Sequence, residues 1–356
     1  MCSDPLRCDL MFPPERVGGT PLKSDSIINA AVIGVGAFGR NHARVYQELA
    51  KQGEPVRLVG IVDSNLDRAD AVTRDFGCRA FGSIHQLLTT HSEVQVASVA
   101  VPTAQHLPVA RTLMEAGIDV LIEKPLAASL VEADQLIRIS QNLGRVVQIG
   151  HLERFNPAVR ATLPLITQPM FFEVHRLSVF TPRSLDIDVM LDLMIHDLDI
   201  VLSFVNSPVK EIRAVGIPIL SGKVDIANVR VEFASGCVAN FTASRVSTER
   251  VRKLRFFQPK QYVSLDYSRQ DVLLFSIDSG SEGTPSANPQ IKLVKPSVTR
   301  EEPLQAELKS FLDAVRTRSK PVVALEDGRR ALALALDILN VIRTHADKIQ
   351  IERLHS

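Results

Sequence analysis

The stretch VIGVGAFGRNH (residues 32–42) joins a short apolar run to a segment with helical spacing. Three glycines stand at the junction with the spacing Gly-x-Gly-x-x-Gly: Gly34, Gly36 and Gly39. Between a strand and a helix, such glycines permit a tight turn, close approach of backbone to a pyrophosphate, and close packing of helix on strand. The amides of the first helical turn, which includes Ala37 and Phe38, would bind the phosphates. The stretch therefore predicts a dinucleotide-binding Rossmann domain.

An acidic residue ends the next apolar run, VRLVGIVD, at Asp63. Folds of this kind place there the acid that binds the ribose hydroxyls of the cofactor. A carboxylate accepts hydrogen bonds from those hydroxyls and repels a 2′-phosphate, and no Lys or Arg follows before Arg68. We therefore predict NAD(H) rather than NADP(H) as the cofactor. His42, just after the glycine loop, would either contact that cofactor or have a structural role in its helix.

Short apolar strands alternate with helical segments over the first part of the chain. Five strands are predicted, at residues 28–35, 56–63, 94–102, 118–125 and 145–151. The alternation indicates βαβ units and a buried parallel sheet. The carboxyl ends of such strands face the ligand, and several candidate cofactor-binding residues stand there: Pro102, Thr103, His106, Glu123 and Lys124. Beside a nicotinamide, the ammonium of Lys124 would stabilise a developing alkoxide.

From about residue 170 the pattern changes to successive strands without long helices between them. Residues 228–245 predict a hairpin that turns at residues 234–236. This part of the chain is typical of a mostly antiparallel sheet, and two amphipathic helices, at residues 303–319 and 325–346, follow it. The expected fold class is therefore α/β, with a Rossmann domain before the antiparallel sheet.

The change of pattern sets the expected domain boundaries. The Rossmann domain is assigned to residues 27–150 and a second domain to residues 151–356. Residues 1–26 contain several prolines and glycines and no long apolar run, so we expect a poorly ordered tail. Residues 279–289 are a loop by composition.

Composition restricts the function classes. The chain has 356 residues, 45% of them apolar and 23% charged, and a net charge of +1, which gives no electrostatic case for nucleic acid or a membrane surface. Its four cysteines lack the spacing of a zinc site or a disulfide framework. No apolar run is long enough to span a membrane. We expect a protein of the reducing cytoplasm that binds no metal.

The segment VMLDLMIHDLDIVLSF (residues 189–204) places ionisable groups in an otherwise apolar helix. At about 100° per residue, Asp192, His196, Asp199 and Ser203 share an arc of roughly 60°. That arc contains no Lys, Glu or Arg, so the helix should be buried except along one edge. Helix geometry leaves two interpretations open, a structural polar seam and a cleft lined by an acid–base pair. Asp197 points away from His196 and is left outside the predicted site.

Several motifs together resemble one known family. In chain order they are Gly-x-Gly-x-x-Gly, VPTAQH (101–106), EKPLAAS (123–129), GHLERFNPAV (150–159) and LDLMIHDLDIV (191–201). Their order and spacing are similar to those of the glucose–fructose oxidoreductase/inositol dehydrogenase (Gfo/Idh/MocA) family, over residues 28–345. The resemblance implies a Rossmann domain plus an α/β domain with a large, open, mostly antiparallel sheet. In that family the sheet serves ligand binding and assembly into homodimers or homotetramers.

The resemblance also implies roles for individual residues. Lys124 matches the lysine of the family's Glu-Lys-Pro motif, whose Lys–Pro bond is often cis. Asp192 and His196 match its Asp-x-x-x-His pair, with the histidine as general base. Asp192, one helical turn earlier, would orient the imidazole. Arg154 and Asn156 belong to a segment that the family uses to contact sugar hydroxyls, and with Lys124, Asp192 and His196 they make up the predicted substrate site.

The implied reaction is oxidation of a sugar-type secondary alcohol by NAD. GHLERFNPAV and LDLMIHDLDIV are most similar to the nucleotide-sugar branch of the family, which oxidises the 3-hydroxyl of UDP-N-acetylglucosamine. A partner aminotransferase then uses the ketone to make lipid A-type envelope glycolipids. A free-sugar or inositol dehydrogenase is an alternative, and a non-catalytic NAD(H)-binding regulator is another. The presence of Lys124, Asp192 and His196 together favours an enzyme over the regulator.

A basic segment lies within the second domain and includes Arg245, Arg250, Arg252, Lys253 and Arg255. A guanidinium fork suits a diphosphate, whereas alternating charges on a strand are typical of a solvated face. The sequence leaves both interpretations open. The following RFFQPKQY (255–262) replaces a glycine-containing turn common in the family, so no ligand contact is carried over there.

Overall fold

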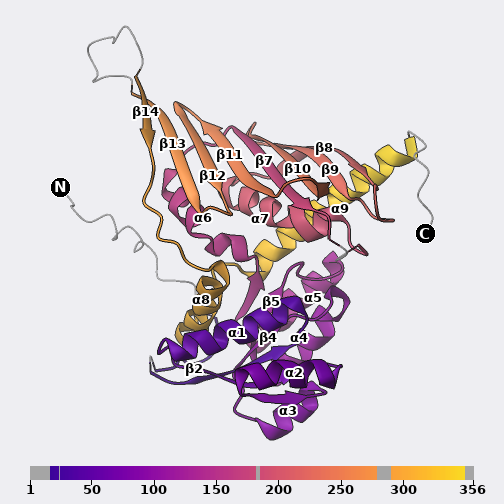
Figure 1. Cartoon of the computed structure of the whole chain (residues 1–356), viewed down its shortest axis with the longest axis vertical. Coiled ribbons are helices and arrows are strands. Elements are labelled where there is room, and N and C mark those ends of the chain that lie inside the picture. The colour runs from indigo at the N-terminus through magenta and orange to yellow at the C-terminus, as the bar shows by residue number, and fades with distance from the viewer. Residues whose placement is uncertain (1–16, 24, 182–184, 279–289, 349–356) are drawn as a thin grey trace, which may run out of the picture. The chain divides into compact units, whose positions relative to one another are not determined.

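The computed structural model describes residues 17–23, 25–181, 185–278 and 290–348 (Figure 1). These form two compact units. The first comprises Met1–Glu123, Val131–Gly150 and Glu307–Leu325, and the second comprises Lys124–Leu130, His151–Ala306 and Glu326–Ser356. Residues 307–325 are grouped with the first unit and residues 124–130 with the second, and the expected domain boundary after residue 150 stays a prediction. Most of the expected tail and the whole expected loop at 279–289 lie outside the described residues.

The first unit contains a six-stranded parallel sheet in the order β3-β2-β1-β4-β5-β6. This is the order of a doubly wound dinucleotide-binding sheet. Its strands are β1 (Ile28–Ile33), β2 (Val56–Val62), β3 (Arg79–Phe81), β4 (Val96–Val99), β5 (Asp119–Glu123) and β6 (Val147–Gly150). Five of these strands were predicted from the sequence. Strand β3 was not, because it has three residues, of which Phe81 alone is buried.

The helices of this unit begin and end where local chemistry dictates. They are α1 (Ala37–Lys51), α2 (Leu66–Phe76), α3 (Ile84–Thr90), α4 (His106–Glu115), α5 (Leu130–Leu143) and α8 (Pro303–Thr317). The side chain of Asn65 caps α2 and that of Ser83 caps α3, each accepting a backbone N–H. Gly77 ends α2 in the left-handed conformation, at φ 63°.

The second unit contains an eight-stranded sheet in the order β14-β13-β12-β11-β7-β10-β9-β8. Neighbouring strands are antiparallel except for β7 and β10, which run parallel. The strands are β7 (Phe171–Val179), β8 (Val209–Ile217), β9 (Ile226–Phe233), β10 (Val238–Ser247), β11 (Val251–Gln258), β12 (Gln261–Asp266), β13 (Asp271–Asp278) and β14 (Gln290–Val294). The predicted hairpin is confirmed as β9 and β10, with Gly236 at φ 85°.

One face of this sheet packs on the helices α6 (Pro157–Thr162), α7 (Ile195–Phe204) and α9 (Leu325–Lys348) (Figure 1). Alternate residues of each strand point to that face because side chains of a strand alternate. On β7, Phe172 and Val174 are buried in this way, and Arg176 takes the next inward position. No helix in the described residues is long and apolar enough to cross a membrane.

The expected continuous α-helix over residues 189–204 is wrong at its first turn. Met190–Met194 form a π-helical turn, in which the amide of Ile195 donates to the carbonyl of Met190. Regular α-helix begins only at Ile195. Because the π-turn spaces side chains differently from an α-helix, the predicted one-turn relation between Asp192 and His196 does not hold.

A buried polar cluster in the first unit was also not predicted. His42 Nε2 lies 2.8 Å from Glu123 Oε1, and His42 Nδ1 lies 3.0 Å from Ser98 Oγ. The carboxyl group of Glu307 is fully buried nearby, with no hydrogen-bond partner among the described residues. Burial and the neighbouring Glu123 raise the pKa of Glu307 well above its usual value. His42 therefore has a structural role, and neither of its nitrogens faces the cofactor cavity.

Candidate active site

A cavity of about 640 Å³ lies in the first unit at the carboxyl ends of its strands. Four of the predicted cofactor-binding residues line it: Gly34, Gly36, Asp63 and Pro102. The lining also includes residues that the sequence analysis did not single out: Ile33, Val62, Ser64, Arg68, Ser83, Ile84, Ala100, Val101, Gln105 and Val109. Ser83 and Ile84 follow β3 directly, so recognising that short strand would have revealed them.

The three glycines of the loop have different surroundings. A Cβ on Gly39 would lie 1.8 Å from the carbonyl oxygen of Gly34, so this position requires glycine for helix and strand to pack. Gly34 has φ 86°, and a Cβ there would lie 2.8 Å from the carbonyl oxygen of Ala100. A Cβ on Gly36 would meet no atom within 4 Å. The open space over Gly36, at the start of α1, fits a pyrophosphate.

Asp63 is fixed by backbone donors at the edge of this cavity. Its Oδ2 accepts the amide of Val35 and its Oδ1 accepts the amide of Asn65, both at 2.9 Å. These bonds hold the carboxylate between the glycine loop and the start of α2. The guanidinium of Arg68 lies 3.7 Å from Asp63 Oδ2 and also lines the cavity. The arrangement is one that can hold a ribose.

The other predicted cofactor-binding residues do not line the cavity. Ala37, Phe38 and Gly39 form the first turn of α1. Thr103 begins a 3₁₀ turn, Thr103–Gln105, ahead of α4, and the His106 ring lies 3.0 Å from the Val101 carbonyl. Glu123 faces His42. A cofactor role for these residues stays a prediction.

In the second unit, Lys124 contacts Asp192. The Lys124 ammonium donates to the backbone carbonyl of Asp192 at 2.7 Å and lies 3.5 Å from its carboxylate Oδ1. The Lys124–Pro125 peptide bond is cis, as the family resemblance implied. The predicted pair of Lys124 and Asp192 is thus brought together, although Asp192 makes no hydrogen bond to His196 in the described structure. Its predicted task of orienting the imidazole finds no support in this geometry.

His196 is 8% exposed and lies edge-to-face with His151, at 6.4 Å between ring centroids. Its Nδ1 is buried and has no hydrogen-bond partner among the described residues. Burial, together with the positive charges of Lys124, Arg176 and Arg252, holds the pKa of His196 well below its usual value. The imidazole is therefore neutral at pH 7, the form that can accept a proton.

Two arginine–carboxylate pairs use the aspartates that follow this histidine on α7. Arg176, which the sequence analysis did not single out, makes a bidentate contact with Asp197 at 2.6 and 3.0 Å and reaches Glu153 at 3.1 Å. Arg154 makes a bidentate contact with Asp199 at 2.6 and 2.9 Å. The predicted substrate contact Arg154 is thus engaged with the carboxylate of Asp199.

Asn156 has a structural role in this geometry. Its side-chain oxygen caps α6 by accepting the amide of Ala158, and its amide donates to Glu153 Oε2 at 3.0 Å and to the Tyr267 carbonyl at 3.1 Å. The side chain is 2% exposed. Its predicted contact with substrate finds no support here.

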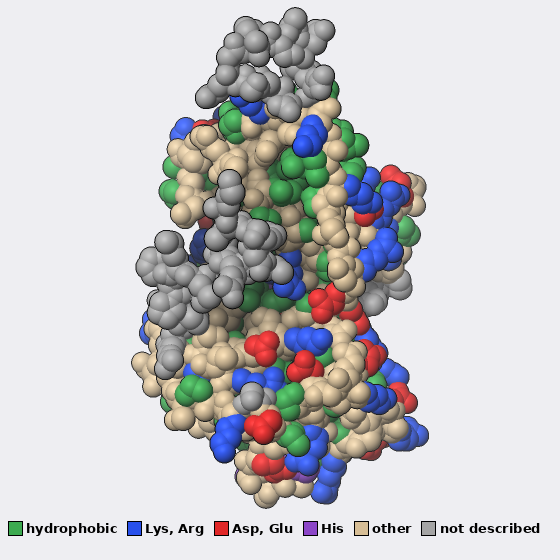
Figure 2. Space-filling view, turned by 90° about the vertical axis from the view of Figure 1, so that its left-hand side faces the viewer, with side chains coloured by type: hydrophobic (Ala, Val, Ile, Leu, Met, Phe, Trp, Pro, Cys, Tyr) green, Lys and Arg blue, Asp and Glu red, His purple; other side chains and the backbone are tan. Residues whose placement is uncertain are grey.

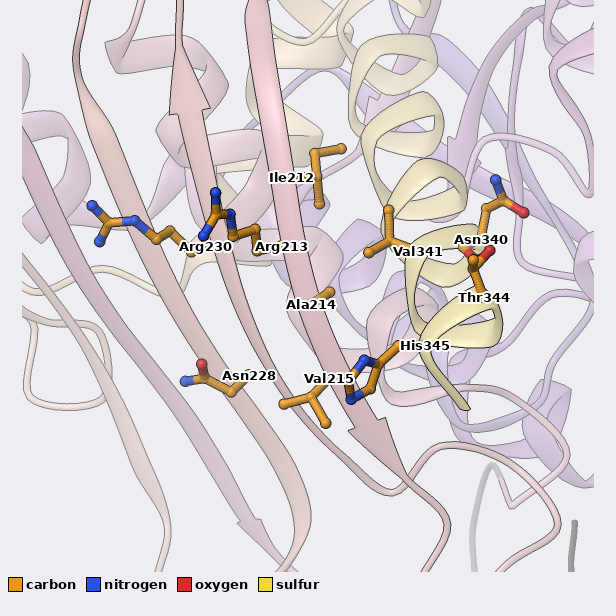
Figure 3. Close-up of a pocket in the computed structure, with 10 residues that line it drawn as sticks. All are labelled: Ile212, Arg213, Ala214, Val215, Asn228, Arg230, Asn340, Val341, Thr344 and His345. Carbon is orange, nitrogen blue, oxygen red and sulfur yellow. The ribbon is translucent and has the colours of Figure 1, made fainter. Parts of the chain in front are cut away.

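A second cavity, of about 530 Å³, lies in the second unit beside the edge strand β8 and helix α9 (Figure 3). Figure 3 shows two guanidinium groups next to each other on the sheet, those of Arg213 and Arg230. Both have partners, since Arg213 donates to Glu211 at 2.7 Å and Arg230 to Asn240 at 3.3 Å. None of the predicted site residues lines this cavity. The described residues contain no cluster of three or more His, Cys, Asp or Glu side chains suited to a metal ion.

Two family models match this chain. The model described as an oxidoreductase family with an NAD-binding Rossmann fold matches residues 28–151, and the GFO/IDH/MocA C-terminal domain matches residues 167–260. The chain belongs to the Gfo/Idh/MocA family of oxidoreductases. The family membership and the open space over Gly36 in the glycine loop together identify it as an NAD-dependent dehydrogenase.

Similar proteins have related activities. A UDP-N-acetylglucosamine 3-dehydrogenase of Acidithiobacillus ferrooxidans is 36% identical over 312 residues, which cover 87% of this chain and 96% of that protein. A solved structure of that enzyme has a TM-score of 0.80 over 89% of this chain and 98% of its own. A myo-inositol 2-dehydrogenase of Thermotoga maritima is 25% identical, over 85% of this chain and 92% of that protein. A levoglucosan dehydrogenase solved with NADH and levoglucosan shares the fold, with a TM-score of 0.78 at 16% identity.

The glycine loop gives a prediction with an internal control. Gly39→Ala should lower stability by about 3 kcal/mol or more, because the new methyl group meets backbone. Gly36→Ala should melt at the wild-type temperature but bind NADH at least about ten-fold more weakly, because its methyl group fills the space for the pyrophosphate. Thermal unfolding and fluorescence titration with NADH measure the two effects. Wild-type NADH affinity in Gly36→Ala would contradict the placement of the cofactor.

Proposed function

We propose that this enzyme oxidises a secondary hydroxyl of a nucleotide sugar, the 3-hydroxyl of UDP-N-acetylglucosamine, with NAD⁺ as the acceptor. The observation that carries the proposal is the similarity, along nearly the full length of both chains, to an enzyme of that activity. The neutral, buried His196 close to the charge of Lys124 supports it, because hydroxyl oxidation requires a base and a stabilising cation.

The residues of the second unit divide the proton chemistry between them. His196 removes the hydroxyl proton of the substrate. Its Nδ1 is buried, so Nε2 is the nitrogen that we assign to this transfer. Lys124 stabilises the negative charge that develops on the substrate oxygen, while Asp192 fixes the ammonium. NAD⁺, which the glycine loop and Asp63 would hold, would supply the acceptor for the hydride of the same carbon, so that a ketone, NADH and a proton on His196 would result.

Several further features belong to the same proposal. The 3-keto sugar would be the substrate of an aminotransferase, in the formation of a diamino sugar for lipid A-type glycolipids or polysaccharide. We place the enzyme in the cytoplasm, because nucleotide sugars and NAD(H) are made there. Glu123 and the other predicted cofactor contacts remain part of the proposed cofactor site.

We also propose that the enzyme is a homo-oligomer through the sheet of its second unit. The sheet face opposite α6, α7 and α9 carries an aromatic ladder across four strands, consisting of Phe171, Phe257, Tyr262 and Phe275. Figure 2 shows hydrophobic side chains gathered on this part of the molecule, and those of β13 and β14 include Ile277, Ile291 and Leu293, all exposed. A second copy covering this face would remove the apolar surface from water.

An assay of NADH formation tests the substrate. With NAD⁺, the enzyme should oxidise UDP-N-acetylglucosamine in preference to free glucose, N-acetylglucosamine or inositol. Because 3-ketosugar formation is unfavourable, a ketone trap or an aminotransferase must be present. Preference for inositol would support the inositol dehydrogenase alternative. Tight NADH binding without turnover of any of these compounds would support the regulator.

Two substitutions test the assigned chemistry. His196→Ala should lower kcat by about 10²- to 10⁴-fold, and Lys124→Ala by about 10²- to 10³-fold, because each removes a group that acts in the transition state. The affinity for NADH should change little in either. His345→Ala removes an exposed histidine and serves as the matched control. A wild-type kcat in the His196 or Lys124 variant would exclude that residue from the chemistry.

A further inference from the structure

Half-buried and buried cations in the described part of the second unit generally face carboxylates. The pairs are Lys124 with Asp192, Arg154 with Asp199, Arg176 with Asp197 and Arg245 with Asp225. Such pairing is expected, because a charge removed from water is costly unless an opposite charge compensates it. Lys253 and Arg252 depart from this pattern, and of these two only Arg252 lies on the inward face of the sheet. The guanidinium of Arg252 has no ion pair and no side-chain hydrogen bond among the described residues.

Arg252 lies on the inward face of β11. Leu254 and Phe256, two and four residues further along the strand, are fully buried on that face. Arg255 belongs to the opposite face, where it pairs with Glu173 at 3.2 Å. The solvated-face interpretation of the basic segment therefore fits Arg255 and not Arg252, because Arg252 shares the inward face with Leu254 and Phe256.

The position of Arg252 brings its charge to the predicted chemistry. Its backbone is the register partner of Arg176 on the neighbouring strand β7. Arg176 in turn holds Asp197, the residue after His196. The charge of Arg252 is among those that lower the pKa of His196. Arg252 is thus a cation close to the proposed base that forms no ion pair among the described residues.

The fold itself disfavours this charge. Burial and the like charges of Arg176 and Arg250 lower the pKa of Arg252, whereas Glu153 and Asp197 raise it less. An arginine that is half-buried, unpaired and beside another arginine contributes little to stability. Residues kept at such a cost are typical of binding sites.

We propose that Arg252 binds the diphosphate of the nucleotide-sugar substrate and so orients the sugar toward His196. The inference rests on the proposed function and deepens it. A guanidinium offers two parallel N–H donors to phosphate oxygens, and it remains charged at all physiological pH values. Arg250, which is exposed two residues earlier on the same segment, adds positive charge on the path of an approaching anion.

The experiment compares Arg252→Gln, Arg252→Lys and the matched control Arg255→Gln with the wild type. For Arg252→Gln, KM for UDP-N-acetylglucosamine and Kd for UDP should each rise about 10- to 100-fold, since a charged hydrogen bond is lost. Arg252→Lys keeps the charge but lacks the two parallel N–H donors of a guanidinium, so its KM and Kd should lie between those of the wild type and of Arg252→Gln. Uridine binding should be unaffected, because it has no phosphate. The rise in KM should exceed any fall in kcat, because the lost contact is with the diphosphate and not with the reacting carbon.

Thermal unfolding separates a binding role from a structural one. Arg252→Gln should melt at or above the wild-type temperature, because an uncompensated charge is removed. A large loss of melting temperature would show that Arg252 is structural and would overturn the inference. The inference would also be overturned if the wild-type enzyme oxidises UDP-N-acetylglucosamine and Arg252→Gln has the same KM for that substrate and the same Kd for UDP. A wild-type enzyme that neither binds UDP nor oxidises the nucleotide sugar would overturn the proposed function, and this inference with it.

Discussion

The buried charge of Arg176 is the constraint around which the second unit is organised. The guanidinium lies on the inward face of the sheet and is 3% exposed, so it requires carboxylates that are equally buried. Asp197 on α7 and Glu153 meet that requirement and tie this face of the sheet to the start of α7. Since Asp197 directly follows His196, the ion pair also fixes where the proposed base can lie. Losing one partner would leave an unpaired charge in the interior.

The same positive charges adjust the chemistry of the histidine. An imidazole among Lys124, Arg176 and Arg252 is held neutral, so it is ready to accept a proton before substrate binds. Once it has done so, the new positive charge is disfavoured until the proton leaves. Lys124 has two effects. Its charge disfavours protonation of His196 in the free enzyme, and it would stabilise the negative charge on the substrate oxygen during the reaction. The electrostatics therefore keep the imidazole unprotonated before reaction and favour loss of any proton that it takes up.

Local patterns in the sequence predict much of this molecule. The glycine loop, the alternation of strand and helix, and the β9–β10 hairpin depend on near neighbours in the chain, and each is found in the structure. Strand β3 was missed because three residues with one buried side chain carry too little periodic signal. The π-turn at Met190–Met194 was missed because its residues have the composition of an α-helix. Arg176 and Glu307 could not be recognised, and Arg252 could not be distinguished from its basic neighbours, since partners or the lack of them are revealed only by folding.

The central claim is that hydride leaves the carbon whose hydroxyl loses its proton to His196, and that this carbon is C3 of the nucleotide sugar. UDP-N-acetylglucosamine deuterated at C3 tests it most directly, with mass spectrometry of the NADH formed in the presence of a ketone trap. The account predicts NADH that carries one deuterium, together with slower turnover wherever hydride transfer limits the rate. Unlabelled NADH, formed as fast as with the undeuterated substrate, would contradict it.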